Sequence, residues 1–176
     1  IILHENYIDF LTIIIGEERE TFVKAKLSKS NRLNSLKSGD RDSPYYLYSQ
    51  AEFHLQWAFC YLKFDQYAIA IYEFILAYNL FIRNQEDFPD FKLNKKGLGV
   101  IYTLLSAVPD QFSWMLDIAG LKGDIKLGLS ELDVVLNDSK LKLYKDEVLF
   151  MISFLQMNMN NNSSICYKYL NMIGED

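Results

Sequence analysis

Histidine and cysteine, the residues most often used for metal binding or nucleophilic attack, are scarce in this sequence. His4, His54, Cys60 and Cys166 are the full supply. Neither histidine has a Cys, Asp or Glu at the spacing of a known metal motif, so we expect no metal site and no cofactor. We expect His54 to be packed or hydrogen-bonded. Cys60 and Cys166 both interrupt apolar patterns, which is typical of buried free thiols, although a disulfide between them stays open.

Carboxylates and glycines also fail to form a recognisable catalytic motif. Glu17, Glu18 and Glu20 cluster in a polar stretch, where paired carboxylates are usually solvated. Gly97 and Gly99 are not followed by the Gly-Lys-Ser/Thr of a phosphate-binding loop. We therefore expect these two glycines to allow close helix packing, and we expect no catalytic residue and no enzyme activity.

Basic residues are concentrated in two places. No acidic residue occurs from Thr21 to Gly39, and a second cluster follows near residue 92. Acidic partners or anionic lipid headgroups are one interpretation, and a solvated helix face is the other. The net charge of −5 and pI of about 5.1 disfavour a nucleic-acid binder, which needs a net basic surface. The basic residues are Lys24, Lys26, Lys29, Arg32, Lys37 and Arg41, then Lys92, Lys95 and Lys96.

The composition predicts that these side chains lie on helices. Of 176 residues, 50% are hydrophobic, but there are just 8 Gly and 3 Pro, so long helices with few turns are expected. The longest apolar run, residues 67–82, contains Glu73, and we interpret it as a buried helix rather than a transmembrane span. Apolar spacing predicts helices over residues 1–16, 17–38, 44–64, 67–83, 93–107, 110–121, 125–136, 141–159 and 163–173.

A repeated helix hairpin is the strongest pattern along the chain. Residues 51–84 match the tetratricopeptide repeat (TPR) pattern, in which small residues let two helices approach and aromatic residues fill the gaps. Asp65 stands where the pattern prefers Gly. The matching residues of this repeat are Trp57, Ala58, Tyr61, Tyr67, Ala70, Phe74 and Ala77.

Two weaker copies follow, over residues 109–137 and 141–173. In the first, Gly123 takes the turn position, Gly128 the position of a small residue and Leu132 the position of a large residue. Met115 and Ala119 are expected to face them. The second copy is degraded and consists of Phe154, Met157, Cys166, Leu170 and Ile173. Uneven spacing of the copies predicts an all-α, irregular array: a right-handed stack of helix hairpins with extra helices, forming one domain over residues 1–176. We expect this domain to be part of a longer chain.

One stretch resembles a particular family. Residues 96–100, 104–109 and 120–124, with Gly128 and Leu132, are similar to the tetratricopeptide repeat protein 39 family. That family has a Gly-rich helix, a Leu-Pro break, a Gly-hydrophobic-x-Gly-Asp turn and a Gly/Leu helix in this order. The whole chain also resembles bacterial TPR proteins of unassigned function. The resemblance implies the fold and a protein-binding role, and it implies no catalytic residue.

The repeat register predicts a groove on the helix of residues 44–64. The predicted concave face consists of Glu52, Leu55, Phe59, Leu62 and Lys63. Its apolar members would anchor a partner peptide or helix. The alternative is that another helix of the chain, from residues 1–16 or 93–107, covers this face.

The leading functional prediction is therefore a non-enzymatic scaffold that binds a protein or peptide through a helical-repeat groove. Self-association is a further possibility, through an apolar edge at the final helix. The alternative is a small-molecule or lipid-binding helical domain with an apolar pocket between helices. The sequence does not fix the compartment; the bacterial resemblance implies a soluble protein of the cytoplasm, or of the periplasm or cell envelope if a signal peptide has been removed.

Overall fold

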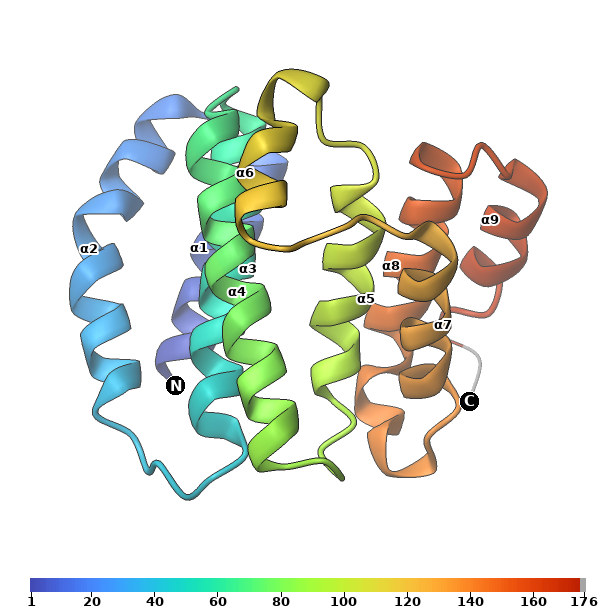
Figure 1. The fold of residues 1–176 in the computed structure, drawn as a ribbon, viewed down its shortest axis with the longest axis horizontal. Coiled ribbons are helices and arrows are strands. Elements are labelled where there is room, and N and C mark those ends of the chain that lie inside the picture. Colours follow the sequence, from blue (N-terminus) through green and yellow to red (C-terminus); the bar gives the residue numbers. More distant parts are fainter. Residues whose placement is uncertain (175–176) are drawn as a thin grey trace. The chain divides into compact units, whose positions relative to one another are not determined.

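The computed structural model describes residues 1–174, and this part of the chain is all-helical, with nine α-helices, two short 3-10 helices and no strand (Figure 1). The expected all-α class is confirmed. The chain divides into two compact units, Ile1–Pro89 and Asp90–Asp176, where the sequence predicted one domain.

The first unit consists of four long helices joined by short turns. The third helix contacts each of the other three, so it is the centre of this unit. Thirteen of its 19 residues are buried, and four of these are polar or charged: Gln50, Glu52, His54 and Gln56. The helices are α1 (Ile2–Gly16), α2 (Arg19–Lys37), α3 (Tyr45–Lys63) and α4 (Tyr67–Asp87).

Local sequence explains how α3 and α4 begin and pair. Pro44 has helical dihedral angles, and the Ser43 Oγ accepts a hydrogen bond from the Tyr45 N–H, as a capping serine does. The turn between the helices places Asp65 at φ 59°, in the left-handed region that Gly adopts most easily. This is the position where the repeat pattern prefers Gly.

The second unit contains shorter helices. Within it α5 packs mainly against α7, α7 and α5 contact α8, and α8 packs against α9. The elements are α5 (Asn94–Leu105), η1 (Asp110–Phe112), α6 (Ser113–Ile118), α7 (Ile125–Leu136), η2 (Ser139–Tyr144), α8 (Lys145–Asn158) and α9 (Ser163–Leu170).

The predicted helix positions agree with the structure except at some ends and at two helices that are divided; the helix predicted over 110–121 is η1 followed by the short α6. The helix predicted to end at residue 83 continues to Asp87, where the buried Asn84 donates from Nδ2 to the Pro44 carbonyl oxygen at 2.9 Å. The helix predicted over 141–159 is instead η2 followed by α8. Asp138 caps the first segment by accepting from the Lys140 N–H, and Leu141 then departs from helical dihedral angles.

The partner predicted for α7 is wrong. Gly128 meets α5, because a methyl group added to it would lie 2.5 Å from the Gly99 carbonyl oxygen and 2.1 Å from the Thr103 Oγ1. Met115 and Ala119 belong to the segment around α6, which has no substantial contact with α7. The tight loop through Gly123 explains this, since the Asp124 N–H donates to the Tyr102 carbonyl oxygen and leads α7 back along α5.

Candidate functional site

The predicted groove residues lie beneath or beside other helices of the first unit. Glu52 and Leu55 are buried. The Phe59 ring contacts Phe10 of α1 at 6.1 Å and Phe74 of α4 at 5.8 Å, measured between ring centroids. Leu62 packs against the core cluster, and Lys63 forms an ion pair with Glu17 at the end of α1. A partner that bound this face of α3 would therefore have to compete with α1.

The residues assigned to the first repeat mostly occupy the core. Ala58, Ala70 and Ala77 are fully buried, and Trp57, Tyr61 and Phe74 are also buried. Tyr67 differs, because its ring is exposed and its hydroxyl donates to Asp65 Oδ1 at 3.0 Å. That hydrogen bond raises the pKa of Tyr67.

A buried ionic cluster connects α2, α3 and α4. Glu73 of α4 accepts from Lys29 of α2 and lies 2.6 Å from the Nδ1 of His54 of α3. Lys29 also lies 4.8 Å from the ring centroid of Tyr61 and 5.2 Å from that of Trp57. The expectation that His54 is packed or hydrogen-bonded is confirmed, since it is buried and its Nδ1 contacts Glu73. We name Lys29, His54 and Glu73 the Glu73 cluster.

Glu73 stays ionised in this cluster. Burial by itself would raise the pKa of its carboxyl group, but the hydrogen bonds and charges of His54 and Lys29 outweigh burial, so the pKa is lowered. Sequence periodicity does not indicate this cluster, because His54 and Lys29 lie 19 and 44 residues from Glu73 in the chain. Its geometry is that of a structural ion pair which holds α2 on α3 and α4.

A second buried polar chain joins α1 to α3. Asn6 donates from Nδ2 to Gln56 Oε1 at 2.6 Å and accepts at Oδ1 from Trp57 Nε1 at 3.0 Å. Both polar atoms of the Asn6 amide and the Trp57 Nε1 therefore have partners, as buried polar atoms require. No group of three or more His, Cys, Asp or Glu within residues 1–174 is placed to hold a metal ion.

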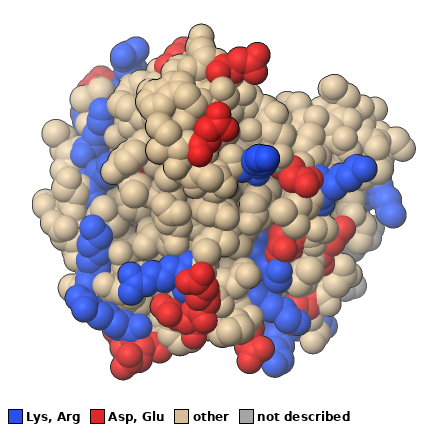
Figure 2. Space-filling view, viewed as in Figure 1, with Lys and Arg blue, Asp and Glu red and all other residues tan. Residues whose placement is uncertain are grey.

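The first basic segment is divided between solvent and the protein interior. Lys and Arg side chains run along α2 (Figure 2). Arg32 pairs with Asp9 at 2.5 Å, and Lys24 pairs with Glu20 at 2.7 Å on the exposed side. The Lys26 amine lies 5.4 Å from the ring centroids of both Phe22 and Tyr61. Several of these basic side chains therefore contact carboxylates or aromatic rings of the first unit itself.

The second basic segment joins helices of the second unit instead of forming a solvated face. Lys92 pairs with Asp138 at 3.0 Å, Lys95 with Glu131 at 2.5 Å and the buried Lys96 with Glu147 at 2.8 Å. These three pairs connect the segment that begins α5 to α7, to the loop before η2 and to α8.

Close helix contact explains the glycines of the second unit. A methyl group added at Gly99 would lie 2.6 Å from the Gly128 carbonyl oxygen, and one at Gly123 would lie 2.0 Å from the Ser106 nitrogen. The expectation that Gly99 serves packing is confirmed.

Both cysteines are buried free thiols, so the disulfide alternative is not observed. Cys60 belongs to the first unit and Cys166 to the second. Burial raises the pKa of the Cys60 thiol to about 12, which leaves it protonated and unreactive at neutral pH.

One helix of the second unit exposes an apolar stripe. Phe150, Phe154 and Met157 of α8 are 58%, 46% and 47% exposed. Their spacing of four and three residues places them on one side of the helix. Other residues of α8, among them Leu149 and Ile152, are buried in the second unit. We name Phe150, Phe154 and Met157 the α8 stripe.

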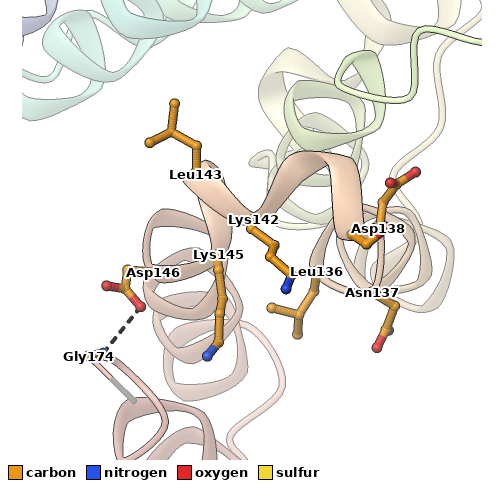
Figure 3. A pocket seen from close by; sticks show the side chains of 9 residues that line it. Leu136, Asn137, Asp138, Lys142, Leu143, Lys145, Asp146 and Gly174 are labelled. Carbon is orange, nitrogen blue, oxygen red and sulfur yellow. Dashed lines mark hydrogen bonds between the residues drawn. The ribbon is translucent and has the colours of Figure 1, made fainter. Parts of the chain in front are cut away.

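A cavity of about 570 Å³ with a mixed polar and apolar lining lies where α7 ends and α8 begins, and we name it the α8 cavity. Lys142 and Lys145 extend on the same side of the η2–α8 segment, whereas Leu143 points to the other side (Figure 3). The charged and polar side chains in the lining of the α8 cavity distinguish it from the apolar pocket between helices that the sequence suggested. The lining residues are Leu136, Asn137, Asp138, Ser139, Lys142, Leu143, Lys145, Asp146 and Gly174.

No helix within residues 1–174 is long and apolar enough to cross a membrane. Comparison of the chain with protein-family models, curated proteins and solved structures gives no match.

Proposed function

We propose that the protein is a non-enzymatic, tetratricopeptide-type scaffold that binds a partner protein, and that the α8 stripe is its contact surface. The observation that carries this proposal is the row of half-exposed apolar side chains on α8. Aromatic and methionine side chains are enriched at protein interfaces, where they bury large areas on contact. An amphipathic partner helix or apolar peptide is the class of ligand that such a row fits.

Two further features support a scaffold. The α3–α4 hairpin packs through alanines at the positions of a tetratricopeptide repeat, with Ala58 and Ala70 fully buried. The resemblance of residues 96–132 to tetratricopeptide proteins favours the same kind of role. The α8 stripe replaces the predicted groove on α3 in this proposal, because α1 already contacts Phe59 and Lys63.

Affinity capture with three forms of the full chain tests the proposal. The unchanged chain is compared with Phe154→Glu and with the matched control Tyr72→Glu, which changes an aromatic side chain that is 55% exposed on α4. We expect one reproducible protein partner that the unchanged chain and Tyr72→Glu retain and Phe154→Glu loses. Retention of every partner by Phe154→Glu would contradict the proposal.

A further inference from the structure

We propose that one face of α2 binds the surface of an anionic lipid bilayer, as a peripheral contact. We name Val23, Leu27, Lys24, Lys26 and Lys37 the α2 outer face. All five side chains are exposed, Val23 by 52% and Leu27 by 79%. The α2 outer face lies in the first unit and is independent of the α8 stripe, which lies in the second.

Helix geometry turns this face away from the core of the first unit. Phe22 and Ala25 of α2 are buried in that core, and Leu33 packs against it. Val23 and Leu27 stand four residues apart, so they lie together on the other side of the helix.

Basic side chains flank the two aliphatic side chains. Lys26 and Lys37 are eleven residues apart, close to three full turns, so they lie along one edge of the face, and Lys24 lies on the other edge. Figure 2 shows Lys and Arg side chains following α2. No acidic residue occurs from Thr21 to Gly39.

Ion pairs within the protein reduce the charge that α2 presents to a partner. Lys29 and Arg32 point inward and pair with carboxylates of other helices. Lys24 pairs with the exposed Glu20 of its own helix at 2.7 Å. These three cations are therefore compensated.

Lys26 and Lys37 form no ion pair with any residue that the structure describes. The Lys26 amine lies 5.4 Å from the ring centroids of Phe22 and Tyr61, and it is exposed in the middle of the face. Two cations alone attract an anionic surface weakly, so the aliphatic side chains must supply the rest of the binding. The other acidic residues near α2 in the sequence lie beyond its two ends and are Glu17, Glu18, Asp40 and Asp42.

The mixture of side chains favours a bilayer over other acidic partners. Val23 and Leu27 can enter the boundary between headgroups and acyl chains, while the lysine amines meet the anionic headgroups. A nucleic-acid backbone offers these aliphatic side chains no apolar surface. Charges more than about 10 Å from the bilayer are screened at about 0.1 M salt, so this face governs the contact rather than the net charge of −5.

The test is co-sedimentation of the purified full chain with vesicles of phosphatidylcholine alone, or of phosphatidylcholine and phosphatidylserine in equal amounts. We expect saturable binding to the vesicles with phosphatidylserine at about 0.1 M salt, and much weaker binding at about 0.5 M. Leu27→Gln should weaken this binding about tenfold through the lost apolar contact. Lys26→Gln should weaken it about fivefold, the contribution of one amine near the surface.

Each variant has a matched control in the second unit. Ile118 of α6 is 80% exposed, so Ile118→Gln matches Leu27→Gln, and Lys126 is an exposed lysine of α7, so Lys126→Gln matches Lys26→Gln. Both controls should bind as the unchanged chain does. Because all four residues are exposed, circular dichroism spectra should be unaltered.

Three outcomes would overturn the proposal. One is the absence of binding that requires phosphatidylserine at millimolar lipid. Another is equal weakening by the variants and their controls. The third is binding to polyglutamate, weakened by Lys26→Gln, without binding to vesicles, which would assign the α2 outer face to an acidic protein instead.

Discussion

At the scale of single residues, the Glu73 cluster buries a carboxylate, which is stable only while its charge is compensated. A buried carboxylate is tolerated because Lys29 and His54 both contact it, and the aromatic rings of Trp57 and Tyr61 face the same amine. Removing one partner from such a cluster leaves an uncompensated charge in a largely dry environment. The cluster is therefore expected to stabilise the fold only when all three of its side chains are present.

Glu73→Gln should destabilise the protein by about 3 kcal/mol, because it leaves the Lys29 charge without its carboxylate. Denaturant unfolding of the full chain measures this change. Lys29→Met in the same chain should recover part of the loss, since the unpaired cation is then absent. Glu20→Gln is the matched control: its pair with Lys24 is exposed, and a change of at most about 0.5 kcal/mol is expected. Equal effects of the two glutamate substitutions would contradict this account.

The lowered pKa of Glu73 also predicts how stability depends on pH. A carboxylate whose pKa is lower in the folded state stabilises the fold fully above its unfolded value, about 4.3, and loses this contribution as the pH falls through the folded value. Unfolding free energy should therefore fall more steeply below about pH 4 in the unchanged chain than in Glu73→Gln. Parallel acid profiles for the two proteins would show that Glu73 is not the group responsible.

At the scale of elements, glycine decides how closely α5 and α7 approach. Gly99 and Gly128 face each other so closely that a side chain on either would meet backbone atoms, which cannot rotate away. The Thr103 Oγ1 completes this contact and also donates to the Gly99 carbonyl oxygen at 2.9 Å.

Gly128→Ala should destabilise the second unit by about 2 kcal/mol through overpacking, as measured by thermal or denaturant unfolding. Gly16→Ala provides the comparison, because nothing lies within 4 Å of an added methyl group at the end of α1. That variant should be neutral or stabilised by up to about 1 kcal/mol, since Ala favours the helix. If Gly128→Ala is as stable as Gly16→Ala, the helices are not in close contact.

The sequence predicted the helices well and their partners less well. Helical periodicity is local, so it placed α3, α7 and α8 within a few residues of their observed positions. The pairing of α5 with α7 was missed because residues 106–124 intervene and adjacent helices were assumed to pair. The Glu73 cluster was missed for a related reason: contacts between residues far apart in the chain leave no periodic signal. Phe154 and Met157 of the α8 stripe were assigned to a degraded repeat, and their exposure becomes evident only when the packing of α8 is known.

At the scale of the whole molecule, each unit has its own core. The cluster around Phe22, Phe53 and Trp57 draws all its members from the first unit, and the second unit is held by the contacts of α5, α7, α8 and α9. Such units are expected to fold with some independence.

A fragment of residues 1–89 should therefore fold cooperatively alone. It contains one tryptophan, Trp57, which is buried, so its fluorescence should be blue-shifted and should move to longer wavelength in a single transition with denaturant. The fragment with Phe53→Ala, which removes a fully buried ring, should unfold at a lower denaturant concentration. A solvent-like emission from the unchanged fragment would show that the first unit depends on the second.

Partner binding through the α8 stripe is the central claim, and the dissociation constant of the captured partner tests it most directly. The constant is measured for the purified full chain, Phe154→Glu, Phe154→Met and the control Tyr72→Glu. We expect Phe154→Glu to weaken binding about thirtyfold, the effect of losing an interface hot spot, while Phe154→Met and Tyr72→Glu change it less than about threefold. A dissociation constant that Phe154→Glu leaves unchanged, in a variant with an unaltered circular dichroism spectrum, would contradict the claim.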